Sequence, residues 1–204
     1  VRKTYTEKEI TQPIKAEYFD ANIQIPMMVT SYRTPSMKSR EARVLDMISS
    51  LLSDGKSSKL YKRLVDDKKM ALQIGSFNFS QEDYGMYIIY GLPMTGFTNA
   101  DLIKEIDDEI QKLQTELINE RDFEKLQNMF ENKFVNSNAT LEGVASNLAT
   151  YYLLYKDVHL INEEINLIRS ITRKEIQEVA QKYLQSQQRL LLDYLPKAFE
   201  KIAK

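Results

Sequence analysis

One histidine and the two glutamates that follow it have the clearest chemical potential in this sequence. Glu163 lies four residues after His159, and Glu164 lies five residues after it. A histidine with a carboxylate at position i+4 can face one metal ion from one side of a helix. A closed metal site needs two more ligands, and no other residues in the sequence stand out as candidates for them. We therefore expect His159 to be a surface or capping residue near the start of a helix.

The counts of histidine and cysteine exclude most self-contained metallohydrolase sites. The 204 residues contain 1 His and 0 Cys, so thiolate metal sites, cysteine nucleophiles and disulfides within the chain are excluded. A single His also excludes H-E-x-x-H and H-x-x-E-H, because both motifs need two. We therefore expect no catalytic residue, no metal ligand and no cofactor in this chain.

Residues 55–58 (GKSS) match the end of a phosphate-binding loop, in which backbone N–H groups and a lysine hold phosphate. The first glycine of that motif would fall at Ser50. The element before the loop is expected to be a helix, whereas the motif requires a strand. We therefore interpret these residues as a connection between two helices.

Several carboxylates occur as adjacent pairs. Neighbouring residues on a helix diverge by about 100°, so such a pair does not converge on one substrate atom. We expect these pairs to lie on solvated faces. They are Asp66 with Asp67, Asp107 with Asp108, and Glu163 with Glu164.

Two further patterns leave alternatives open. Asn138 and Thr140 fit the N-glycosylation acceptor, but a helix N-cap explains them equally well. A set of tyrosines could line a groove for a peptide, or could form the edge of the core with hydroxyls in water. These tyrosines are Tyr84, Tyr87, Tyr90, Tyr151 and Tyr152.

Composition narrows the possible partners. The chain has 28 Lys+Arg against 29 Asp+Glu, for a net charge of -1, which leaves no bulk basic field for nucleic acid. The longest charge-free run, residues 84–100, contains three Gly and one Pro and is too short and broken for a membrane span. The start at Val1, with no signal segment, indicates a fragment or a processed product of unknown compartment.

Hydrophobic periodicity indicates the order of elements in the first half. Residues 1–15 are polar and read as a lead-in or linker, and alternating apolar residues predict a strand over 21–29 that ends by Pro35. A helix with apolar residues from Val44 to Leu52 ends at Gly55, and Ser57 or Ser58 caps a second short helix. Residues 70–79 and 84–92 form an antiparallel hairpin.

The second half is mainly helical. Helices are predicted after the caps Thr98 with Asp101 and Asn119 with Asp122, over residues 140–155 and 158–169, and after the capping box of Thr172 with Glu175. Residues 190–195 then form a closing strand. The order β-α-β-β-α-β predicts an α+β fold, an enlarged ferredoxin-like sandwich with an antiparallel or mixed sheet against several helices. We expect residues 16–204 to form one domain.

Residues 46–77 resemble the signature of the insulinase-like zinc metallopeptidases, which include pitrilysin and mitochondrial processing peptidase. In that family a helix ends in a Gly turn and is followed by a Ser-Ser-Arg-Leu helix and a Gly-Leu-Ala-Tyr strand. The matching pieces here are Gly55, residues 57–61 (SSKLY), residues 63–64 (RL) and residues 70–72 (MAL). The resemblance extends to residues 98–126 and to the closing strand at 190–196.

The resemblance implies that two domains have different roles, one catalytic and one not. In the family, zinc and the catalytic base lie on an H-x-x-E-H helix of another domain, and this chain resembles the second domain, which has no zinc motif. An Arg and a Tyr seven residues apart contact substrate in a related domain. The aligned residues here are Val65 and Leu72, which can supply neither charge nor hydrogen bonds, so substrate contact is not transferred to them and substrate-binding residues remain unassigned.

Three functions are therefore weighed. The first is a non-catalytic domain that forms part of the wall of a peptide chamber and supports a zinc-bearing homologous domain, with zinc expected in that partner or upstream domain. The full-length protein would then be a zinc metallopeptidase, and this chain alone would be inactive. The second is a structural or assembly subunit resembling respiratory-complex core proteins. The third is a free-standing peptide-binding module.

Overall fold

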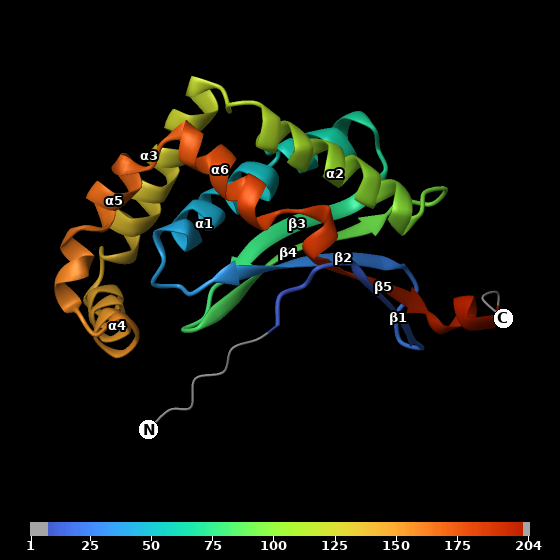
Figure 1. The fold of residues 1–204 in the computed structure, drawn as a ribbon, viewed down its shortest axis with the longest axis horizontal. Helices are drawn as coiled ribbons and strands as arrows, with labels where there is room; N and C mark the ends of the chain where they lie inside the picture. The colour runs from blue at the N-terminus through green and yellow to red at the C-terminus, as the bar shows by residue number, and fades with distance from the viewer. Residues whose placement is uncertain (1–7, 202–204) are drawn as a thin grey trace.

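A computed structural model describes residues 8–201, and these residues form a five-stranded sheet with helices on one side (Figure 1). The strand order is β1-β5-β2-β4-β3. β1 is parallel to β5, and the other neighbouring strands are antiparallel, so the sheet is mixed. The strands are β1 (Ile14–Asp20), β2 (Met27–Pro35), β3 (Ala71–Phe79), β4 (Tyr84–Pro93) and β5 (Arg189–Pro196).

The helices α1, α2 and α6 cover one face of this sheet, and α3, α4 and α5 extend past one end of it (Figure 1). The α-helices are α1 (Arg40–Ser53), α2 (Asn99–Thr115), α3 (Glu120–Ser137), α4 (Leu141–Thr150), α5 (Glu164–Ser170) and α6 (Arg173–Tyr183). The shorter helical segments are η1 (Tyr61–Asp67), η2 (Tyr151–Tyr155), η3 (Val158–Asn162), η4 (Ser186–Gln188) and η5 (Lys197–Lys201). Among the residues described, no helix is both long and apolar enough to cross a membrane.

The elements from β2 to β5 confirm the predicted β-α-β-β-α-β order and the α+β class. Their sheet order, β5-β2-β4-β3, is that of a ferredoxin-like sandwich, and β1 is added beside β5. Each strand of the predicted hairpin lies within one residue of its expected bounds. The extra helices α3 to α5 enlarge the second βαβ connection.

The predicted start of the first strand was wrong, whereas its predicted end by Pro35 is confirmed. Residues 21–26 lie outside any strand, and β2 begins at Met27. The reason is a local turn: the Asp20 carboxylate accepts hydrogen bonds from both the backbone and the side-chain nitrogen of Asn22, at 2.7 and 2.9 Å. Pro26 just before β2 removes a further donor for strand pairing.

The strand β1 was not predicted, and it begins at Ile14 inside the expected lead-in of residues 1–15. Residues 1–7 of that lead-in lie outside the described residues. The division into a lead-in and a single domain over residues 16–204 stays a prediction.

Polar caps determine where most helices begin. The capping box of Thr98 with Asp101 and the Asn119 cap of α3 are confirmed. Thr172 accepts the Glu175 N–H at 3.2 Å, but the Glu175 carboxylate binds Arg40 instead of completing a capping box. The predicted serine cap of the second helix was wrong, because the Ser58 hydroxyl donates to the Gly55 carbonyl.

The ranges 140–155 and 158–169 were each predicted as one continuous helix, and both predictions were incomplete. The first is divided into α4 and the π-helical η2, and the second into the 3₁₀ segment η3 and α5.

Gly55 has φ of 74°, which confirms the left-handed turn expected after α1.

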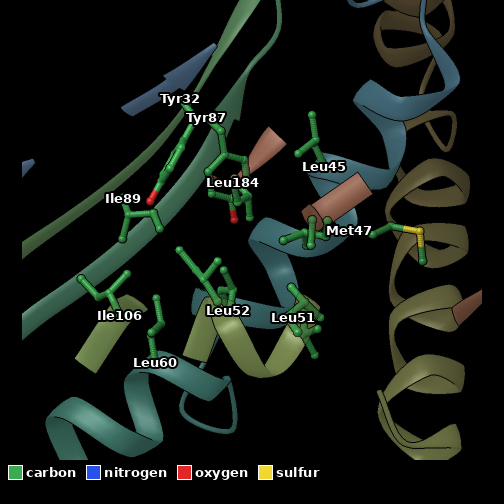
Figure 2. Packing of buried hydrophobic residues seen from close by; sticks show 14 of the residues in the cluster. Tyr32, Leu45, Met47, Leu51, Leu52, Leu60, Tyr87, Ile89, Ile106 and Leu184 are labelled. Atoms are coloured by element: carbon green, nitrogen blue, oxygen red, sulfur yellow. The ribbon is translucent and has the colours of Figure 1, made fainter. Parts of the chain in front are cut away.

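The core lies between the helices and one face of the sheet. Figure 2 shows Tyr32, Tyr87 and Ile89 on the strands packed against leucines of α1 and Ile106 of α2. Tyr32 and Tyr87 are buried, and the Tyr87 hydroxyl donates to Ser76 at 3.3 Å. The α1 residue Ser53 accepts a hydrogen bond from the Ser76 N–H at 2.8 Å and donates to the Ser76 carbonyl at 3.1 Å. This hydroxyl therefore satisfies backbone groups of the edge strand β3.

Arg63 fixes the π-helical segment η1 to α2 through three carboxylates. Its guanidinium donates to Glu105 at 2.6 Å, Glu109 at 2.5 Å and Asp108 at 2.8 Å, and Lys68 donates to Glu105 at 2.6 Å. The hydrogen bond from Lys68, with that from Arg63, lowers the pKa of Glu105 although burial opposes the shift. Burial would raise the pKa of Glu109, but hydrogen bonds from Lys112 and Arg63 outweigh it, so this pKa is lowered too.

We expect Arg63→Met to lower the free energy of unfolding at pH 7 by about 2 kcal/mol, because two largely buried carboxylates lose their shared partner. Carboxylates with a lowered folded-state pKa contribute stability above their unfolded pKa of about 4.3, and that contribution disappears as the pH falls through the folded-state value. Urea unfolding should therefore show a large difference from the parent at pH 7 and little at pH 2.5. Lys62→Met, at the exposed neighbouring position, is the control. An equal difference at both pH values would contradict the prediction.

Candidate functional site

The face of the sheet opposite the helices is apolar, and no helix of the described chain covers it (Figure 1). In β2 and β4, one set of alternate residues is buried under the helices and the other set is only partly covered or exposed. A sheet packed on one side normally shows polar residues on its other side. Here the second face carries Met86, Ile88, Tyr90 and Leu92 on β4 alone. We refer to this surface as the open face.

Strand register places the side chains of the open face in rows, two of which cross all five strands. One row ends in Tyr18 on β1, and another ends in Phe79 on β3; these side chains are 56% and 49% exposed. Cross-strand neighbours on one face lie close enough to make a continuous surface. The rows are Tyr18, Tyr194 and Met27; Ala16, Leu192, Val29, Tyr90 and Gly75; Ile14, Leu190, Ser31, Ile88 and Phe77; and Arg33, Met86 and Phe79.

Aromatic contacts order two parts of the open face. The rings of Tyr18 and Tyr194 stack with centroids 5.3 Å apart, and the Tyr194 hydroxyl donates to Asp20. That hydrogen bond lowers the pKa of Asp20 and raises the pKa of Tyr194. At the other side of the sheet, Phe77 meets the Tyr90 ring edge-on at 6.4 Å. These contacts hold flat apolar surfaces in fixed positions.

The structure does not assemble the histidine and glutamates into a metal site. His159 is exposed, and its backbone N–H donates to Asp157 at 2.9 Å, as expected for a residue near a helix start. The Glu164 carboxylate accepts from Arg43 at 2.9 Å and from Tyr151 at 2.6 Å. Because Arg43 and Tyr151 occupy this carboxylate, the set does not fit zinc. No group of three or more His, Cys, Asp or Glu within the described part of the chain could hold a metal ion.

The GKSS residues and the Asn138 and Thr140 pattern each make hydrogen bonds that explain them structurally. The GKSS residues form the turn between α1 and η1, where Ser57 accepts a hydrogen bond from Lys125 at 2.6 Å. This turn follows a helix, as expected, and not a strand. The Asn138 side chain donates to the Phe134 carbonyl at 2.9 Å and accepts from Asn147 at 3.1 Å. The Thr140 side chain caps α4.

The carboxylate pairs diverge as predicted, but the expectation of solvated faces was wrong for two pairs. In one of them Glu163 is exposed, but the Glu164 side chain is only 13% exposed and binds Arg43 and Tyr151. The other is Asp107 with Asp108. Asp107 forms two hydrogen bonds with the buried guanidinium of Arg189, and Asp108 binds Arg63. Asp66 and Asp67 are exposed, in agreement with the expectation.

The tyrosines considered as one groove lie in different places. Tyr84 and Tyr90 belong to the open face, whereas Tyr87 is buried under the helices. Tyr151 and Tyr152 are on η2, beyond the sheet. The open face was not predicted, because its aromatic residues were grouped along the chain and not by the two alternate faces of β4. The detectable signal was that β4 is apolar at odd and even positions, as in a strand covered on both sides.

Val65 and Leu72 stand where the resemblance places a substrate-contacting Arg and Tyr. Val65 is partly buried and packs against the core, and Leu72 is 48% exposed beside an irregularity in the β3–β4 pairing. Both side chains are aliphatic, so neither can bind a peptide carbonyl or stabilise developing negative charge.

The fold and the open face define a one-sided α+β domain whose described part contains no metal-binding constellation. A family model described as the peptidase M16 inactive domain matches residues 2–130. The chain therefore belongs to the family of peptidase M16 inactive domains, which confirms the resemblance to the insulinase-like metallopeptidases.

Individual relatives agree with this assignment. The chain is 25% identical over 166 residues to the zinc protease PqqE of Helicobacter pylori, covering 81% of this chain and 37% of that protein. The crystal structure of a protease from H. pylori superposes with a TM-score of 0.87 at 23% identity, over 95% of this chain and 46% of the other. This chain thus spans less than half the length of both proteins.

Two other structures share the fold at lower identity. The inactive peptidase domain of a Bordetella parapertussis protein has a TM-score of 0.75 at 20% identity, over 84% of this chain and 93% of that one. A chain of complex III2 from Candida albicans also has a TM-score of 0.75, at 15% identity, over 92% of this chain and 46% of the other.

The open face requires glycine at position 75. A Cβ atom placed there would lie 2.5 Å from the Tyr90 ring, so the ring occupies the space that any other residue would need. We expect Gly75→Ala to lower the free energy of unfolding by about 1–3 kcal/mol. In a Tyr90→Ala chain the same substitution should be neutral or slightly stabilising, because the clash is gone and Ala loses less backbone entropy than Gly. Urea unfolding of the four proteins measures this, and an equal cost in both backgrounds would disprove it.

Proposed function

We propose that this chain is a non-catalytic domain of a zinc metalloendopeptidase. In this proposal its open face forms part of the wall of a peptide chamber, and the domain supports a homologous domain that carries H-x-x-E-H and the zinc. In the expected division, residues 1–15 are the lead-in that joins the two, and residues 16–204 form the single supporting domain, to whose sheet Ile14 and Lys15 of β1 are added. Membership of the M16 inactive-domain family supports the non-catalytic role.

The open face is the observation that carries the proposal. A monomeric soluble protein rarely exposes an apolar patch of more than a few hundred Å² unless the patch binds something. Here such side chains extend from Ile14 on β1 to Phe79 on β3, across all five strands. A second domain facing this surface would enclose a space from which water is largely excluded. A peptide in that space could contact many apolar side chains while the zinc domain supplies the chemistry.

The alternative is a structural or assembly subunit without proteolytic activity. The fold shared with a chain of complex III2 from C. albicans is compatible with it, and so are the aliphatic residues Val65 and Leu72. That likeness concerns the fold alone. The two functions differ in whether the complete protein contains an H-x-x-E-H domain, which its full coding sequence would reveal.

We expect the purified 204-residue chain to show no peptide hydrolysis with equimolar zinc. The complete protein should hydrolyse a quenched fluorescent peptide in a zinc-dependent manner. Within it, Phe77→Asp with Met86→Asp should lower kcat/KM at least about tenfold, because two charges disrupt the apolar wall. The matched control is Asn132→Asp with Asn136→Asp, which adds two charges on the exposed side of α3 and should leave the activity unchanged.

Three results would oppose the proposal in different ways. Hydrolysis by the isolated chain with stoichiometric zinc would show that it is catalytic. A complete protein without zinc-dependent hydrolysis would favour the structural subunit. Equal activity of the open-face and α3 variants, both folded by circular dichroism, would show that the open face does not border the substrate.

A further inference from the structure

One end of the open face is hollow. A cavity of about 430 Å³ lies there. Apolar side chains from three strands form part of its lining: Phe79 on β3, Tyr84 and Met86 on β4, and Leu190 on β5. The polar side chains in the lining are Ser31, Arg33, Gln81, Glu82 and Asp83. A fifth apolar side chain in its lining, Ile10, comes from the segment that precedes β1. The cavity is large enough for one aliphatic or aromatic side chain of a peptide.

The segment of residues 8–13 lies against this cavity in an ordered way. Arg33 on β2 donates a hydrogen bond from Nη1 to the Lys8 carbonyl at 2.6 Å. The Arg33 guanidinium also lies over the Tyr84 ring, 5.9 Å from its centroid, which fixes its direction. Within residues 8–13 only Ile10 is shielded from solvent, and its five neighbours are exposed. The segment therefore contacts this end of the open face through the main-chain carbonyl of Lys8 and, two residues later, through the aliphatic side chain of Ile10.

This pattern is typical of the recognition of an extended peptide. Main-chain groups supply affinity that does not depend on sequence, and a pocket for an alternate side chain supplies specificity. Neither contact requires residues 8–13 to be part of the same chain. An aliphatic side chain in the cavity meets the apolar side chains of Phe79, Met86 and Leu190. The carboxylates of Glu82 and Asp83 in the same lining disfavour an acidic side chain.

We propose that this end of the open face is a binding site for an extended peptide with an aliphatic side chain, and that residues 8–13 occupy it as an internal strap. This inference rests on the proposed role of the open face as a peptide-facing wall, and it assigns to that wall one specific side-chain pocket. Arg33 holds the main-chain carbonyl of the peptide, and the cavity receives the side chain two residues later. The strap and a substrate peptide compete for the same contacts.

Competition between the strap and a free peptide can be measured as a change in the affinity of the free peptide. A tethered segment is present at an effective concentration of the order of millimolar, so it outcompetes a free peptide at micromolar concentration. We use a fluorescein-labelled peptide with the sequence of residues 6–13 as the probe and measure its anisotropy with the 204-residue chain. Ile10→Asp in the chain should release the strap and tighten probe binding at least about tenfold. Gln12→Asp, at an exposed position of the same segment, is the matched control and should leave probe binding unchanged.

Two further variants locate the bound probe. In the Ile10→Asp chain, Phe79→Asp should abolish probe binding, whereas Tyr18→Asp at the opposite side of the open face should not affect it. A probe that itself carries Ile10→Asp should not bind any of these proteins. If the Ile10→Asp chain does not fold by circular dichroism, a chain of residues 12–204 takes its place.

Equal probe affinity for the parent and the strap-released chain would overturn the proposal, and so would binding that persists with the Asp probe or with Phe79→Asp. These measurements need neither zinc nor hydrolysis. If they fail while the open-face variants of the complete protein still lose peptidase activity, only the strap and its pocket are disproved. If the peptidase assay fails while the probe binds as expected, the pocket stands without the peptidase role.

Discussion

The packing of helices against only one face of the sheet is the constraint on which the rest of the structure depends. The apolar stripes of α1, α2 and α6 bury Tyr32, Tyr87 and Ile89, and this burial supplies most of the hydrophobic core. Polar contacts then hold the remaining elements to these helices. Arg63 ties η1 to α2, and Arg43 on α1 ties the outer helices through Glu164. The second face of the sheet has no such cover, yet it is built from the same types of residue.

That asymmetry links fold and function. An uncovered apolar sheet face is typical of a surface that binds a partner or a ligand. The register gives this face a continuous surface, and Gly75 with Tyr90 shows that its side chains are packed against one another. On this face the guanidinium of Arg33 donates a hydrogen bond to the main-chain carbonyl of Lys8. In the proposed function the domain contributes shape and apolar contact, and the zinc chemistry belongs to another domain.

Much of the fold followed from local sequence signals, and the surface that matters most did not. Caps such as Thr98 with Asp101 and the 3.6-residue periodicity fixed α1, α2, α3 and α6, because these signals act within one or two turns. The strand β1 was missed because its exposed, partly charged residues give no burial pattern. The open face was missed because it requires the register of all five strands, which is set by contacts between residues far apart in sequence. Glu175 shows the same limit, since its partner Arg40 is distant along the chain.

The two edge strands have a consequence for the solubility of a domain with such a surface. An uncovered sheet with free edges can add strands from other copies without limit, as amyloid does. On β3 the Ser53 hydroxyl occupies the backbone groups of Ser76, which would otherwise pair with an incoming strand. On β1 the exposed charges of Lys15 and Glu17 oppose close approach by an unspecific partner. Both features oppose edge-to-edge pairing between copies of this domain, while the apolar face between the two edges stays accessible.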